Sequence, residues 1–183
     1  MNDDFKKIIT ILKYLDVKIN APSDSMNFES RMILQKLTYI CQSIGMVMRY
    51  TFNLYIYGPY SPTLAADYYK NPQLIKQSVS SSDLNQQEIK ACKKLKQHLV
   101  SHDLFQAHKV EFLEAVATLF YFKNLNSNYN DDELFKKTKE NKPYLRDRII
   151  IIALNVVKEL IFDKDQVTSD LKQELDIWEK AED

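Results

Sequence analysis

The stretch Tyr55-Ile56-Tyr57-Gly58-Pro59-Tyr60-Ser61-Pro62 (residues 55–62) holds one of the two glycines and two of the five prolines of the 183-residue chain. A glycine can adopt the positive φ of a sharp turn, and a proline fixes the next φ near its turn value. Ser61 is a good helix N-cap, and Pro62 suits the first position of a helix. The stretch therefore predicts a tight corner between a strand and a helix, made by Gly58, Pro59, Ser61 and Pro62.

The residues before the corner alternate in the manner of a strand. Apolar and aromatic side chains at Tyr50, Phe52, Leu54 and Ile56 are separated by outward-facing positions, and β-branched and aromatic types are enriched. This pattern predicts a strand ending at Tyr57, with residues 46–48 as a short partner strand. A glycine at the end of a helical pattern is a common helix stop, so Gly45 is expected to end the preceding helix.

The rest of the chain has helical periodicity, with apolar residues at steps of three and four. The predicted fold class is mainly α: a compact bundle of about seven to eight helices with one small β-hairpin or strand element around residues 46–57. A single domain is expected over residues 1–183, with residues 164–183 as a helical C-terminal extension. Helices are predicted over residues 4–15, 27–44, 62–70, 83–101, 110–123, 131–140, 144–162 and 168–181. Residues 110–123 are apolar nearly all round, which predicts a helix at the centre of the core.

Composition gives no sign of a global affinity for nucleic acid or membrane. Lys+Arg and Asp+Glu number 25 each. Residues 1–100 carry 13 basic and 8 acidic side chains, and residues 101–183 carry 12 and 17, so the two parts have net charges of +5 and −5. The longest apolar run is far shorter than a membrane span, and the acidic N-terminus is unlike a signal peptide. We expect a cytoplasmic protein that does not bind a membrane.

Residue types that carry catalysis or bind metals do not form a convincing arrangement. His98 and His102 have a helical spacing that would allow metal binding, but exposed histidines near a helix end are the favoured interpretation. Cys41 and Cys92 lie on apolar stripes, which predicts buried, inert and reduced thiols. Ser61 lacks the surroundings of a nucleophile. The sequence therefore predicts a protein that is not an enzyme and has no metal or other cofactor.

The region around the corner resembles a protein family. Its residues are similar to those of the YwgA-like bacterial and phage-associated proteins, which resemble in turn the broader Panacea antitoxin group. The similarity includes Lys36, Tyr57, Gly58 and Asp67 and is densest over residues 31–70. A weaker similarity follows at residues 112–117 and at Lys142-Pro143. The resemblance implies a module of a phage-defence or toxin–antitoxin locus on a mobile element, which binds and silences a toxin or effector encoded in the same operon.

Two interpretations of function stay open. The first is a non-enzymatic module that masks or scaffolds a partner protein, since tyrosines on an outward face are typical of interfaces. Its candidate contacts are Tyr55, Tyr57, Tyr60, Asp67 and Lys36. The second is a winged-helix-like transcriptional regulator that binds DNA, suggested by a helix followed by a strand and a turn. Its candidate phosphate contacts are Arg31, Lys36 and Arg49. A homodimer is compatible with either.

Overall fold

The computed structural model describes residues 3–22, 27–76 and 84–162. These residues form nine α-helices, one π-helical turn and a two-stranded antiparallel sheet, which confirms the mainly helical class. The elements are α1 (Asp3–Tyr14), α2 (Phe28–Ser43), β1 (Asn53–Tyr55), β2 (Gly58–Tyr60), α3 (Pro62–Lys70), α4 (Pro72–Lys76), α5 (Gln86–Leu95), the π-helical turn (Lys96–Val100), α6 (Asp103–Ala107), α7 (Lys109–Leu125), α8 (Asp131–Asn141) and α9 (Asp147–Ile161).

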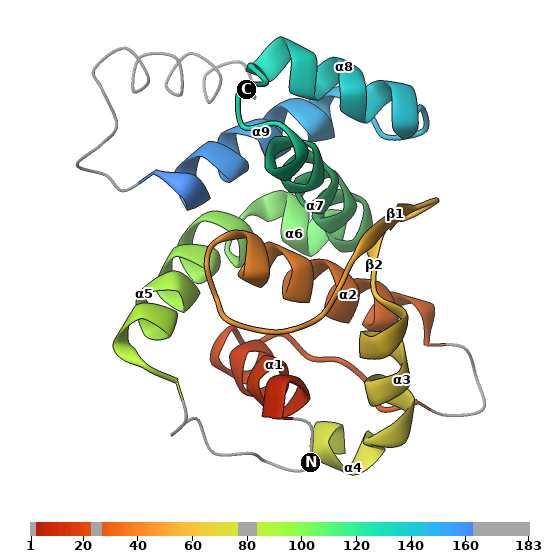
Figure 1. Ribbon diagram of the computed structural model, residues 1–183, viewed down its shortest axis with the longest axis vertical. Coiled ribbons are helices and arrows are strands. Elements are labelled where there is room, and N and C mark those ends of the chain that lie inside the picture. Colours follow the sequence, from red (N-terminus) through yellow and green to blue (C-terminus); the bar gives the residue numbers. More distant parts are fainter. Residues whose placement is uncertain (1–2, 23–26, 77–83, 163–183) are drawn as a thin grey trace.

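Helices α2 and α7 form the centre of the fold and pack against each other. Residues 32–41 of α2 and 112–120 of α7 are all buried. A helix that is apolar on every side must be covered on every side, which confirms the central position predicted for residues 110–123. Helices α8 and α9 pack on α7 on one side of this pair, while α1, α3 and α4 lie on the other (Figure 1). The buried apolar residues of the described segments, apart from Met32, make one continuous cluster.

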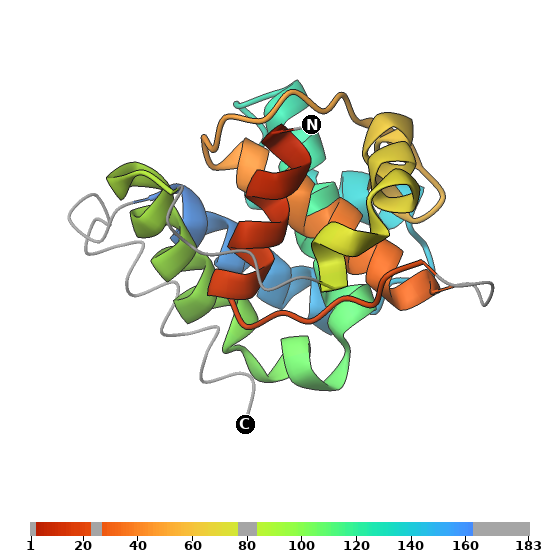
Figure 2. The ribbon, with the colours of Figure 1, turned by 90° about the horizontal axis from the view of Figure 1, so that it is seen from below.

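Helix α1 lies at the surface of the bundle, where it contacts α3 and α4. Seen from below, α1 lies in front of α2, with α3 and α5 on opposite flanks (Figure 2). Phe5, Ile8 and Leu12 on the inner face of α1 are at most 2% exposed. The spacing of these residues is the one that the sequence predicts, because residues three and four apart share one helical face.

The strand predicted before the corner is displaced in the structure. Only Asn53–Tyr55 is a strand, and it pairs with Gly58–Tyr60 and not with residues 46–48. Residues 46–52 do alternate between buried and exposed, with Met46, Met48 and Tyr50 inside. The alternation is thus real, but it belongs to an extended segment with which no strand among the described residues pairs.

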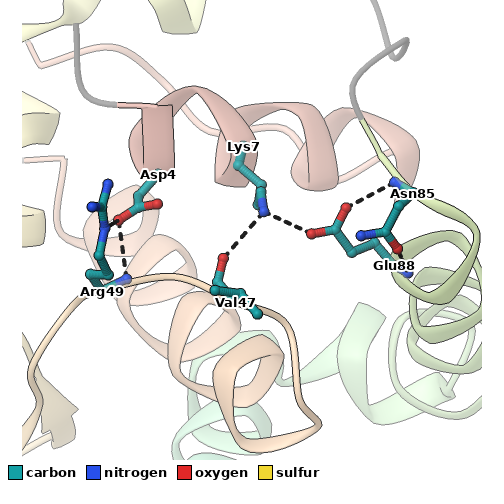
Figure 3. Close-up of polar contacts among 6 residues, drawn as sticks. All are labelled: Asp4, Lys7, Val47, Arg49, Asn85 and Glu88. Atoms are coloured by element: carbon teal, nitrogen blue, oxygen red, sulfur yellow. Dashed lines mark hydrogen bonds and ion pairs between the residues drawn. The ribbon is translucent and has the colours of Figure 1, made fainter.

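The backbone of this extended segment is held by side chains (Figure 3). Asp4 accepts from the Arg49 backbone N–H at 3.1 Å and from Arg49 Nε at 3.2 Å. Lys7 Nζ donates to the Val47 carbonyl at 3.2 Å and to Glu88 Oε1 at 2.7 Å. Glu88 also forms the capping box of α5 with Asn85. Helix α1 therefore joins residues 47–49 to the start of α5.

Several helix ends lie where the sequence predicts. Gly45 has φ +92 and ends α2. Ser61 caps α3, with Pro62 in the first turn. Helix α9 differs, because it begins at Asp147 and not at Tyr144. The predicted helix over residues 168–181 and the extension over residues 164–183 lie outside the described residues.

No helix within the described ranges is both long enough and apolar enough to cross a membrane. Cys41 and Cys92 are free and completely buried, as the sequence predicts. Burial raises the pKa of the Cys41 thiol, and it raises the pKa of Cys92 to about 11. Both thiols are therefore kept from water and from the reactive thiolate form.

Both cysteines should be inert in the folded chain. We expect an aromatic disulfide reagent at a pH of about 8 to react slowly with the native protein and rapidly, at both thiols, with the protein in urea, because only unfolding exposes the thiols and restores their ordinary pKa. The reaction is followed by absorbance. Rapid reaction of one thiol without urea would contradict the described burial.

Candidate protein-interaction site

The site is built on the β1–β2 hairpin. Asn53 pairs with Tyr60, Leu54 with Pro59 and Tyr55 with Gly58, so Ile56 and Tyr57 form the tight turn. Gly58 has φ +79, the positive value expected from the sequence. Gly58 does not lead directly into a helix, however. It follows the two-residue turn and starts the returning strand β2.

Strand β2 is fixed to α2 by side chains that take the place of a third strand. The Gln35 side chain donates from Nε2 to the Ser61 carbonyl at 2.9 Å and accepts from the Ser61 N–H at 2.8 Å. From the next residue of α2, Lys36 Nζ donates to the Pro59 carbonyl at 2.7 Å. These bonds satisfy backbone groups that would otherwise be buried without partners.

The turn is fixed from the other side by the segment between α8 and α9. Lys142 Nζ donates to the carbonyls of Tyr55 and Ile56, the second at 2.5 Å. Tyr144 Oη donates to the Ile56 carbonyl at 2.7 Å and is hydrogen-bonded to Glu114 of α7. Residues 142–146 hold the turn, which accounts for the later start of α9.

Lys36, Lys142 and Glu114 place three ionisable groups in the interior, at 1%, 2% and 3% exposure. Burial lowers the pKa of Lys36 to about 7, although Glu114 opposes the shift. Burial also lowers the pKa of Lys142 and raises that of Glu114, against their mutual attraction. Desolvation therefore outweighs the opposite charges, and each group is shifted toward its neutral form.

Gly58 lies directly against this buried cluster. A Cβ atom at Gly58 would stand 3.0 Å from Thr118 Oγ1, 3.4 Å from Lys36 Cε and 3.5 Å from Glu114 Cγ. Two independent constraints thus require glycine here: a positive φ and a close approach of the backbone to α2 and α7.

The outer side of the hairpin carries exposed apolar and aromatic side chains. Ile56 is 74% exposed, and the other large side chains are about half exposed. Tyr57 packs edge-on against Phe28 with ring centroids 5.3 Å apart. We call this set the aromatic tip. It consists of Phe28, Tyr55, Ile56, Tyr57 and Tyr144.

The structure separates the residues predicted to contact a partner. Tyr55 and Tyr57 lie in the aromatic tip, and the half-buried Tyr60 packs edge-on against Tyr55 at 5.4 Å. Asp67 accepts a hydrogen bond from Tyr50 Oη at 2.9 Å. Lys36 does not fit its predicted role as a surface contact, since its ammonium group bonds to the Pro59 carbonyl in the interior.

The candidate phosphate contacts are also engaged within the chain. Arg31 donates to Tyr69 Oη at 3.2 Å, Arg49 pairs with Asp4, and Lys36 is buried. Helix α2, which the regulator interpretation would place in a DNA groove, is buried over residues 32–41. A recognition helix needs an exposed face, so the geometry does not support this interpretation.

Glu114, Lys142 and Tyr144 are parts of the site that were not predicted from the sequence. A signal was present, because Glu114 interrupts the apolar stretch 112–120 and Lys36 interrupts the apolar stretch 32–41. A charged residue in a helix that is otherwise apolar all round predicts a buried polar partner. The identity of that partner depends on the tertiary structure.

The histidines have roles within the chain. His98 Nδ1 lies 2.8 Å from Glu159 Oε2, and His102 Nδ1 accepts from the Leu104 N–H at the start of α6. Within the described segments, no group of three or more His, Cys, Asp or Glu side chains could hold a metal ion.

Comparison of the chain with protein-family models, curated protein sequences and solved structures gave no match.

Substitution of Gly58 by alanine should destabilise the fold more than the same change at Gly45. Both glycines have positive φ, but a Cβ at Gly45 meets nothing within 4 Å. We expect Gly45→Ala to lower the free energy of unfolding by about 1–2 kcal/mol, the strain of the left-handed backbone. Gly58→Ala should cost about 1–3 kcal/mol more through overpacking. Urea unfolding measures both, and equal losses would contradict the close approach.

The buried Lys36 should make stability rise with pH above neutrality. Its pKa is about 7 in the folded chain and higher when unfolded. Between these values the unfolded state binds the additional proton, so raising the pH favours folding. Between pH of about 7 and about 9, the wild type should gain up to about 1.4 kcal/mol per pH unit relative to Lys36→Met.

Urea unfolding at several pH values gives these slopes. Exposed Lys136 provides the control, because Lys136→Met should keep the wild-type slope. If the free energy of unfolding changed with pH equally in the wild type and in Lys36→Met, Lys36 would have the same pKa in the folded and the unfolded chain, which would contradict the prediction.

Proposed function

We propose that this chain is a non-enzymatic protein-binding module that recognises its partner with the aromatic tip. The single observation that carries the proposal is a hairpin that is hydrogen-bonded to α2, Lys142 and Tyr144 and packed on α7, while its large side chains face outward. Tyr57 and Tyr144 are 49% and 51% exposed, and Ile56 is 74% exposed. Aromatic side chains clustered on a surface are typical of residues that dominate binding energy.

The anchoring of the hairpin supports a role in recognition. Association costs conformational entropy when surface loops must become ordered. Here the carbonyls of the turn accept hydrogen bonds from Lys142 and Tyr144. The carbonyls of Pro59 and Ser61 accept hydrogen bonds from Lys36 and Gln35. The tip is therefore pre-organised, so that little of the binding energy is lost in ordering it.

The resemblance to YwgA-like and Panacea proteins supports a choice of partner. In this proposal the partner is a toxin or effector encoded in the same operon of a phage-defence or toxin–antitoxin locus. The chain masks or scaffolds that protein in the cytoplasm. The buried lysines, Glu114 and Tyr144 hold the recognition surface in place and do not act on a substrate.

The proposal predicts which exposed side chains matter for binding. Tyr57→Ala and Ile56→Ala should each weaken capture of the operon partner by about tenfold or more, the effect of losing a binding hot spot. Val47→Ala is a matched control, because Val47 is also 74% exposed but lies in the segment held by α1. Thermal midpoints should change little for all three variants, since each side chain is exposed.

The measurement is co-purification of the tagged full chain with the product of the neighbouring gene, followed by titration. Equal affinity for wild type, Tyr57→Ala and Ile56→Ala would count against the aromatic tip. A gel shift with the upstream DNA, at low salt and without the partner, tests the regulator interpretation. Retardation there that weakens steeply with salt would favour DNA binding instead.

A further inference from the structure

The two outer edges of the hairpin differ in their hydrogen bonding. In β2 the Pro59 carbonyl, and directly after β2 both backbone groups of Ser61, are bonded to side chains of α2. Gly58 and Pro59 are buried as well. This edge is closed, and no further strand can pair with it.

The outer edge of β1 has a backbone donor and acceptor available. Leu54 pairs with Pro59, which has no N–H, so this pair cannot be the hydrogen-bonded kind. In an antiparallel pair, the N–H and C=O of a residue at a non-hydrogen-bonded position point away from the partner strand. The backbone of Leu54 therefore faces outward. Among the described residues, no side chain bonds to its N–H or C=O.

Two of the three residues of β1 are exposed. Asn53 and Tyr55 are exposed, whereas the side chain of Leu54 packs against the core. Strand β2 packs on α2 and α7, and the main neighbour of β1 is β2. Lys142 and Tyr144 bond to the Ile56 carbonyl at one end of the edge. The open part of the edge is thus short and begins next to the aromatic tip.

We propose that the partner protein adds an extended segment to the outer edge of β1, as a third antiparallel or parallel strand. An unpaired edge is a template for strand addition, in which main-chain hydrogen bonds give affinity and alternate side chains give specificity. The segment bonds to the N–H and C=O of Leu54. The side chains of this segment that lie on the same face of the sheet as Leu54 are apolar. Those on the opposite face pack beside Tyr55. This inference rests on the proposed function and specifies how the partner is held.

The test removes the outward N–H of Leu54 without removing a hydrogen bond between β1 and β2. Leu54→Pro lacks this donor, and proline is tolerated in an edge strand where its missing N–H faces outward. Leu54→Ala is the matched control, because it loses the same apolar side chain but keeps the N–H. The probe is a library of random peptides displayed on phage and selected on the full wild-type chain. Peptides from the selection are titrated against the wild type, Leu54→Pro, Leu54→Ala and Tyr57→Ala.

We expect selected peptides with alternating apolar residues that bind Leu54→Pro about tenfold more weakly than Leu54→Ala, the effect of an unpaired acceptor. Peptide should also slow hydrogen exchange of the Leu54 amide in the wild type, which needs no variant to fold. Equal binding to Leu54→Pro and Leu54→Ala, or unchanged exchange at Leu54, would overturn strand addition.

The outcomes separate this inference from the proposed function. Peptides that lose affinity for Tyr57→Ala but not for Leu54→Pro would leave the aromatic tip as the binding surface and overturn strand addition alone. Failure to select any peptide, or self-association of the chain that Leu54→Pro abolishes, would also overturn it, since the edge would then have no peptide partner or would be used by a second copy.

Discussion

The arrangement of this protein depends on backbone carbonyls of one hairpin that are satisfied by two buried ammonium groups. Lys36 bonds to the carbonyl of Pro59, and Lys142 bonds to the carbonyls of Tyr55 and Ile56. A buried carbonyl without a partner costs about 1–3 kcal/mol, and a buried ammonium group without one costs more. Each group thus needs the other, so the hairpin and the central helices fold as one unit. Glu114 adds a compensating carboxyl group between the lysines.

This constraint explains why the centre of the fold contains charges at all. The central stretches of α2 and α7, residues 32–41 and 112–120, are buried on all sides, and most of the residues in these two stretches are apolar. Removing one member of a buried polar network destabilises a fold strongly, whereas replacing the whole network by apolar residues is often neutral or stabilising. The number of hydrogen bonds in this polar cluster is therefore not a measure of how much the cluster stabilises the fold. Its effect is to specify one position of the hairpin, and that position decides which side chains face outward.

The consequences for recognition follow from the asymmetry of the hairpin. Strand β2 is bonded to α2, while the turn and β1 lie on the outside. The large side chains of Tyr55, Ile56 and Tyr57 are therefore exposed on a segment whose backbone carbonyls are hydrogen-bonded to Lys142 and Tyr144. The same asymmetry leaves the outward backbone groups of Leu54 next to these side chains. A partner that used both would gain apolar contact from the tip and main-chain hydrogen bonds from the edge.

The amino-acid sequence by itself determined most of the longer helices, the helix ends at Gly45 and Ser61, the central place of α7 and the existence of a glycine–proline corner, but not the short helices α4 and α6. These features depend on neighbours within a few residues, so local periodicity and capping chemistry suffice to predict them. Only the tertiary structure decided that β1 pairs forward with Gly58–Tyr60, that Lys36 is buried, and that Lys142 and Tyr144 hold a turn more than 80 positions earlier in the chain. Pairings at such separations follow from how helices pack, and no local pattern encodes which buried carbonyl a given lysine will meet.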